Sequence, residues 1–139
     1  MKLPALLSLL LFFQFPNFAF HFGLANGDLQ EAKSFFQQGE YEKAIFKYQK
    51  LAKTNDPRLA LEANLGLGQV LIQKGDYQKA EKISKKTLET FPEHADALTL
   101  QGTVFKLTGR YEDARTNFGK ALKQNPDHFS ARLNLGIMQ

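Results

Sequence analysis

The chain has 139 residues, which is enough for one domain of ordinary size but not for two. Its 18 Lys and Arg stand against 14 Asp and Glu, so the formal net charge is a mild +4. There is no Cys, which excludes a disulfide framework, a zinc cluster of thiolates, a thiol nucleophile and a lipid-modified cysteine.

Residues 1–25 have the features of a secretory signal peptide: one positive charge, a long apolar run and a small-x-small cleavage site. Gly23 and Ala25 supply the small residues, so we expect cleavage after Ala25, with Ala19 as the second choice. The alternative is a membrane anchor over residues 3–25, a stretch long enough to cross a bilayer. Either way the remainder is expected to be exported, into a periplasm or out of the cell, with membrane contact only through an uncleaved signal segment.

The remainder of the chain contains one sequence block three times, at nearly equal spacing. A regular period of about 34 residues predicts an array of helical repeats. Each block opens with a Gly, where one helix is predicted to end and the chain to turn back, because a left-handed residue is easiest without a Cβ. The Tyr of each block is expected to pack on the preceding helix, and its Ala to let the two helix axes approach closely. The blocks are Gly39–Ala44, Gly75–Ala80 and Gly109–Ala114.

Proline and aspartate mark the other helix ends. Pro92 and Pro126 stand at the same distance after the Gly of their respective blocks and are predicted to end the second helix of their units. In the first unit Asp56 is predicted to be the N-cap of the next helix and Pro57 its first residue, which explains why the first interval between blocks is slightly longer than the second. Asp76 is likewise predicted to cap the helix that follows it.

These features resemble the tetratricopeptide repeat, whose motif combines a Leu-Gly pair, an aromatic residue, the Gly-x-Tyr turn, an Ala and a closing Pro. The resemblance covers the chain after the signal segment, although the motif's early Trp is absent and Ser84 and Thr87 replace a larger aromatic and a small Ala. It implies an all-α, right-handed superhelical solenoid of antiparallel helix hairpins, with about three repeats plus the first helix of a fourth. The predicted repeat domain is 26–139, with units at about 25–60, 61–94 and 95–128 and a partial unit at 129–139.

The repeat region shows no recognisable catalytic or metal site. His94 and His128 occupy the same slot in successive units, and stacked units should hold them about 8–10 Å apart, too far for one metal ion. The segment Gly66-Leu67-Gly68 lacks the third glycine of a dinucleotide fingerprint and falls within a predicted helix. We therefore predict no catalytic residues, no metal, no cofactor and no enzymatic activity for this segment.

A basic cluster lies in the second unit, and with two nearby carboxylates it carries a charge of +3. Three of its lysines share one face of the second helix. In the family that this sequence resembles, second helices form the outer, convex wall, which implies a solvated face. An anionic partner is the alternative, but nucleic acid is not expected, because no aromatic residues are interleaved and the segment is expected to be exported. The cluster consists of Lys74, Lys79, Lys82, Lys85 and Lys86.

The resemblance also implies that the first helices line a concave groove, which would bind a protein or peptide partner. By register, the wall of this groove is predicted to carry Leu29, Lys33, Phe36, Leu65, Gln69, Ile72, Thr99, Thr103 and Lys106. Some members of the family hold a chaperone's C-terminal acid with a clamp of five side chains. The matching positions here carry Leu29, Lys33, Gly66, Asp96 and Leu100, of which only Lys33 is basic, so a chaperone-tail receptor is disfavoured.

The favoured function is therefore an exported module that mediates protein–protein interaction through this groove, as a scaffold or adaptor. We expect it to be the N-terminal part of a longer chain. The competing interpretation is the substrate-capture or targeting region of a larger exported enzyme, for example a peptidase, whose catalytic domain would lie beyond residue 139.

Overall fold

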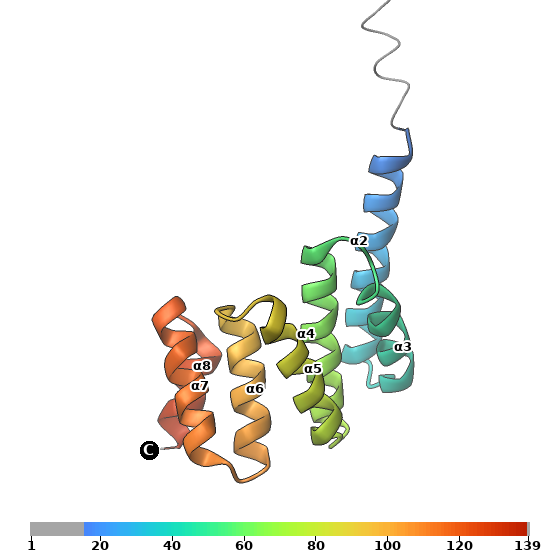
Figure 1. The fold of residues 1–139 in the computed structure, drawn as a ribbon. Helices are drawn as coiled ribbons and strands as arrows, with labels where there is room; N and C mark the ends of the chain where they lie inside the picture. The colour runs from blue at the N-terminus through green and yellow to red at the C-terminus, as the bar shows by residue number, and fades with distance from the viewer. Residues whose placement is uncertain (1–15, 139) are drawn as a thin grey trace, which may run out of the picture.

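The computed structural model of the chain describes residues 16–138, and this part forms seven α-helices and no strand. The first six helices pair into three successive hairpins, and the seventh packs on the last of them (Figure 1). This arrangement confirms the predicted all-α array of three hairpins plus the first helix of a fourth. Residues 1–15 of the predicted signal segment lie outside the described residues. The helices are α2 (Pro16–Gln37), α3 (Tyr41–Leu51), α4 (Pro57–Gln73), α5 (Tyr77–Thr90), α6 (Ala95–Leu107), α7 (Tyr111–Gln124) and α8 (Phe129–Ile137).

Each hairpin turns at the predicted glycine. Gly39, Gly75 and Gly109 have φ of 75°, 79° and 81°, and no other described residue has a positive φ. The N–H of the residue after each glycine donates to the carbonyl five positions earlier, at 2.8 to 2.9 Å. This bond satisfies carbonyls that the end of the first helix would otherwise leave without a partner. The three turns are therefore confirmed, each with a left-handed glycine.

The predicted cap of α4 is confirmed. Asp56 has an extended backbone, and its carboxylate accepts from the N–H of Arg58 at 3.0 Å and of Leu59 at 3.3 Å, with Pro57 as the first helical residue. The predicted side-chain cap of α5 is wrong. Asp76 holds the N-cap position, but its ψ of 58° is not extended and its carboxylate accepts from the Lys79 ammonium at 3.2 Å instead. The tight turn after the glycine does not give Asp76 the extended backbone that a capping side chain needs.

The second helices end where the prolines predict. α5 and α7 each end two positions before a proline, Pro92 and Pro126 respectively. Proline has no N–H for the helical ladder, and it disfavours helical geometry in the residue before it. The chain then turns within a short segment into the next first helix.

The alanines of the three blocks lie in the interior of the array. Ala44, Ala80 and Ala114 are completely buried. The block tyrosines behave less uniformly: the first two are half-buried as predicted, whereas Tyr111 is 56% exposed. In that unit the guanidinium of Arg110 lies over the ring of Phe105, 4.0 Å from its centroid, and takes the face that a tyrosine could cover. The prediction for Tyr111 is therefore wrong.

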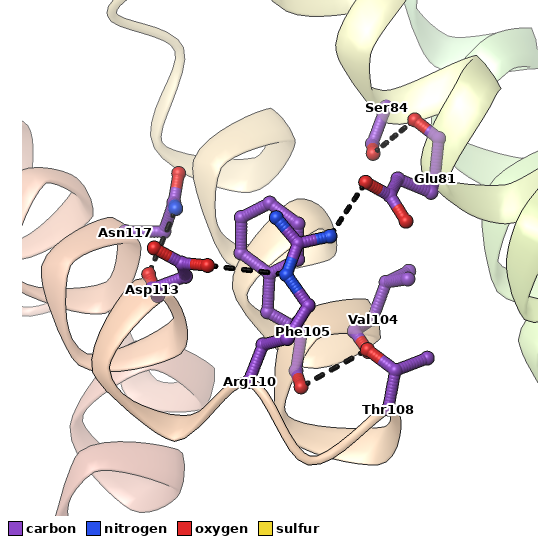
Figure 2. A network of polar contacts seen from close by, with 8 residues as sticks. All are labelled: Glu81, Ser84, Val104, Phe105, Thr108, Arg110, Asp113 and Asn117. Atoms are coloured by element: carbon purple, nitrogen blue, oxygen red, sulfur yellow. Dashed lines mark hydrogen bonds and ion pairs between the residues drawn. The ribbon is translucent and has the colours of Figure 1, made fainter.

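A polar network fastens the third unit to the second (Figure 2). Arg110, in the turn between α6 and α7, donates to the Glu81 carboxylate on α5 at 2.8 Å and to Asp113 on α7 at 3.1 Å. Such exposed pairs contribute little stability singly. The pair of Arg110 and Glu81 does join α5 of the second unit to the α6–α7 hairpin of the third. Lys74 and Glu42 form the corresponding bridge between the first two units.

The first helix extends beyond the predicted start of the repeat. α2 begins at Pro16 and runs on through Ala25, so the predicted cleavage site lies inside a helix. The contacts between α2 and the rest of the array begin at Asp28 and Leu29. Leu29 is buried, and Asp28 accepts from the Lys47 ammonium at 2.9 Å. Within residues 16–138, no helix is both long enough and apolar enough to cross a membrane.

Candidate functional site

The inner helices α2, α4 and α6 lie side by side, and with the start of α8 they enclose one open groove of about 760 Å³. Ligand-binding clefts commonly have volumes of about 300–1,000 Å³. The lining mixes apolar, uncharged polar and charged side chains: Lys33, Phe36, Gln37, Tyr48, Glu62, Leu65, Gly66, Gln69, Ile72, Gln73, Asp96, Thr99, Leu100, Thr103, His128, Ser130 and Asn134.

Of the nine residues predicted for the groove, all but two lie in this lining. Those that the structure brings together there are Lys33, Phe36, Leu65, Gln69, Ile72, Thr99 and Thr103. Leu29 is the first exception, because it is only 5% exposed and packs into the core that the first two units share. Lys106 is the second: it is not part of the lining itself, and its ammonium donates to the side-chain oxygen of Asn134, a lining residue on α8. These two placements correct the register-based prediction.

Several lining residues were not predicted. Ser130 stands one repeat period after Asp96, so the register contained the signal that α8 continues the wall. Gln37 and Gln73 extend the lining at the ends of α2 and α4. Tyr48 gave no such signal, because it belongs to α3, an outer helix.

The charges within the groove are largely paired with one another. Lys33 stands 3.8 Å from Glu62. His128 Nδ1 accepts from the N–H of Ala131, so its proton lies on Nε2, which is 2.8 Å from Asp96 Oδ1. The ion pair of Lys33 and Glu62 is neutral, whereas the Asp96 carboxylate is hydrogen-bonded to a neutral imidazole and keeps its negative charge.

The two repeat-equivalent histidines both lie near the Asp96 carboxylate. His94 Nδ1 lies 4.0 Å from Asp96 Oδ2, while His128 bonds the other oxygen of the same carboxylate. The carboxylate of Asp96 therefore stands between the two imidazoles. In the part of the chain that the structure describes, no group of three or more His, Cys, Asp or Glu side chains is arranged to hold a metal ion.

Comparison with known families agrees with this architecture. The family model described as tetratricopeptide repeat-like domain matches residues 23–135. The chain belongs to this family. A curated relative, the BBSome complex member BBS4 of Bos taurus, is 29% identical over 140 aligned positions, which cover 78% of this chain and 27% of the relative. The chain covers smaller shares of the other curated relatives reported, down to 10%.

Solved structures show the same tetratricopeptide fold. The first such domain of human RPAP3 has a TM-score of 0.74 at 18% identity, covering 82% of this chain and 88% of that chain. The first such domain of Spaghetti (RPAP3), solved bound to the HSP90 peptide SRMEEVD, has a TM-score of 0.70 at 19% identity, covering 82% and 89%. At these identities the similarity establishes the fold of the chain, a solenoid of tetratricopeptide hairpins.

The positions that would form a carboxylate clamp in this tetratricopeptide groove lack its cations. Leu29 is buried, Gly66 has no side chain, and Asp96 places a negative charge where the clamp has a basic residue. Lys33 does lie in the groove but is paired with Glu62. A free C-terminal carboxylate would therefore find no free cation among the described lining residues.

The predicted basic cluster lies on the outer helix α5, apart from Lys74, which follows α4. Lys82, Lys85 and Lys86 are exposed. Lys79 pairs with Asp76 at the start of its own helix, and Lys74 with Glu42 of the first unit. None of these lysines belongs to the lining of the groove.

Proposed function

We propose that this chain is an exported tetratricopeptide module that binds a segment of a protein partner in its concave groove, as a scaffold or adaptor and without catalysing a reaction. The observation that carries the proposal is the groove itself: an open cleft of about 760 Å³ lined almost entirely by the inner helices. Peptide-recognition surfaces commonly combine a few apolar anchors with hydrogen-bonding groups that fix register.

The composition of the groove fits this role. Phe36, Leu65 and Ile72 supply half-buried apolar contacts on α2 and α4, beside the amides of Gln69 and Gln73. Concave sites that combine apolar contacts with a few polar groups are typical of ligand-binding sites. The Spaghetti domain, which has the same fold, was solved with a bound peptide, and this also supports peptide binding here.

The test uses two multiple variants of the exported protein. In the first, Phe36→Ala is combined with Ile72→Ala, which removes both apolar anchors. Truncating a buried anchor commonly costs about 2 kcal/mol or more, so partner affinity should fall at least tenfold. In the second, Lys79, Lys82 and Lys86 are each replaced by Glu. This variant changes the outer face only, and its affinity at moderate salt should stay close to that of the wild type.

The partner is first captured from an envelope extract, and the purified pair is then titrated with each variant. Circular dichroism shows whether the variants keep their helical content. If the lysine variant loses binding and the anchor variant keeps it, the groove hypothesis is wrong and an anionic partner of the outer face replaces it.

Export adds a second proposal, cleavage after Ala25. The predicted site lies shortly before Asp28, where the ion pair to Lys47 and the burial of Leu29 fasten α2 to the array. Cleavage would leave the Asp28 carboxylate near the new N-terminus of α2, where the helix dipole favours a negative charge. Sequencing the exported protein should therefore find Asn26 first. An intact Met1 on a membrane-extracted product would instead support an anchor over residues 3–25.

A further inference from the structure

One residue of an outer helix reaches the groove through a gap at a glycine. Tyr48 lies on α3, yet it lines the groove, and it is the only residue of the described lining that an outer helix supplies. The gap is at Gly66 on α4, where an added Cβ would lie 2.5 Å from Cε1 and Cζ of Tyr48 and 2.9 Å from its hydroxyl oxygen. The corresponding slots of the later units carry the side chains of Leu100 and Asn134. The hydroxyl end of Tyr48 therefore occupies the space of the missing side chain.

Tyr48 is almost completely buried, and its hydroxyl end is the part that faces the groove. The residue is 2% exposed, no hydrogen bond joins its hydroxyl to another described residue, and the hydroxyl oxygen itself is not fully buried. Burial raises the pKa of this phenol, so it keeps its proton at neutral pH. Water in the open groove can accept from this hydroxyl, and a ligand that supplies an acceptor can replace that water. The groove thus holds an unused donor on its floor.

The other hydrogen-bonding groups of the groove indicate what this donor can meet. The hydroxyls of Thr99 and Thr103 already donate to carbonyls of their own helix, each at 2.8 Å. Lys33 is paired with Glu62, so the described lining holds no free cation for an anionic ligand. Gln69 stands one turn after Gly66, and its exposed amide can both donate and accept. The Asp96 carboxylate disfavours an anionic acceptor, so the Tyr48 hydroxyl is best matched by a ligand that supplies uncharged acceptors.

The backbone of an extended peptide meets this requirement. The carbonyls inside a helix are already bonded to its own N–H groups, whereas those of an extended segment are free. We propose that the Tyr48 hydroxyl donates to a main-chain carbonyl of an uncharged, extended segment of the partner, through the gap that Gly66 leaves. This inference rests on the proposed function of the groove and specifies the class of segment that it accepts.

The test begins with a phage-displayed library of random dodecapeptides, selected on the mature wild-type chain. Selected sequences are synthesised with acetylated and amidated ends, so that they carry no terminal charge. Tyr48→Phe should weaken their binding about fivefold, which corresponds to the roughly 1 kcal/mol of a neutral hydrogen bond. Tyr111→Phe is the matched control: it removes a hydroxyl from an exposed tyrosine outside the groove and should leave the affinity unchanged.

Two further measurements separate binding from folding and locate the bond. The melting temperature of Tyr48→Phe should be equal to or above that of the wild type, because the hydroxyl has no partner to lose among the described residues. Replacing each peptide amide in turn by an ester weakens one carbonyl acceptor at a time. At one position the difference between wild type and Tyr48→Phe should disappear.

The outcomes distinguish this inference from the proposed function. If capped peptides bind, lose affinity when Phe36 and Ile72 are truncated, but bind Tyr48→Phe as tightly as the wild type, the inference is wrong and the groove remains the binding site. Selected peptides that bind only with a free C-terminal carboxylate would also overturn it. If no peptide is selected, or if truncating the two anchors leaves every selected peptide bound, the proposed function fails as well.

Discussion

Replacing Gly109 by Ala tests the geometry of the hairpins with the smallest possible change. Gly109 has φ of 81°, and an added Cβ would meet no atom within 4 Å, so the substitution perturbs the backbone and not the packing. An L-residue in the left-handed region costs roughly 1–2 kcal/mol. Ala also restricts the unfolded chain, which offsets about 0.4–1 kcal/mol. The free energy of unfolding should therefore fall by about 1 kcal/mol.

The same hairpin contains a matched control. Gly119 lies inside α7, and a Cβ there would also meet no atom within 4 Å. Because its backbone is already helical, Gly119→Ala should raise the free energy of unfolding by about 0.5–1 kcal/mol. Repeat arrays can unfold in part. Both substitutions lie in the α6–α7 hairpin, so partial unfolding of this unit would affect both variants.

The assay is denaturant unfolding followed by far-ultraviolet circular dichroism, repeated as a thermal melt. For a domain of this size, each kcal/mol shifts the melting temperature by about 4 °C. We expect the two variants to fall on opposite sides of the wild type. If Gly109→Ala is as stable as wild type, or if both variants shift in the same direction, the left-handed turn is not what requires glycine at Gly109.

Two further predictions concern packing and charge. Ala80→Leu should destabilise the chain by about 1–3 kcal/mol, because Ala80 is completely buried; an unchanged thermal melt would show that the repeat register is wrong. The hydrogen bond to Lys47 lowers the pKa of Asp28 in the folded chain below its usual 3.8. The contact therefore stabilises the fold fully above pH 3.8, and this stabilisation is lost as the pH falls through the lower pKa of the folded chain. Asp28→Asn should therefore lower stability at neutral pH and flatten the acid limb of a denaturation series, and an unchanged acid limb would contradict the assigned contact.

The elements that sequence reasoning predicted correctly depend on local rules. Gly39 and its two equivalents are required by a backbone conformation, and the prolines act through their own ring. Asp56 caps α4 because an extended residue precedes a helix that starts with Pro57. Asp76 has the same residue type in the same nominal position, but a different ψ left its carboxylate unable to cap. Residue type was visible in the sequence, whereas this backbone angle follows from how the turn packs.

The groove was predictable where equivalent positions of different repeats line the same wall. Gln69 and Thr103 share a slot and line the same wall. Leu29 stands at the position equivalent to Leu65, which lines the groove, yet Leu29 is buried in the core of the first two units. Lys106 extends to Asn134 on α8. Register therefore located the face of each inner helix, while burial and pairing along that face depended on the neighbours.

Tyr48 shows most directly why repeat register could not supply the floor of the groove. Its counterpart Phe118 packs on Gly102 of its own unit, where an added Cβ would lie 2.8 Å from the ring. In the first unit, Ala32 stands at the position equivalent to Gly102, and its Cβ takes the space that the Phe118 ring uses in the third unit. Tyr48 lies instead against Gly66 of the second unit. Tyr48 differs from Phe118 by its hydroxyl, Ala32 differs from Gly102 by a methyl group, and Gly66 differs from Leu100 by a whole side chain. Together they bring the hydroxyl of a buried tyrosine to the concave face, so the departures from the repeat, and not the repeat itself, determine what the centre of the groove can recognise.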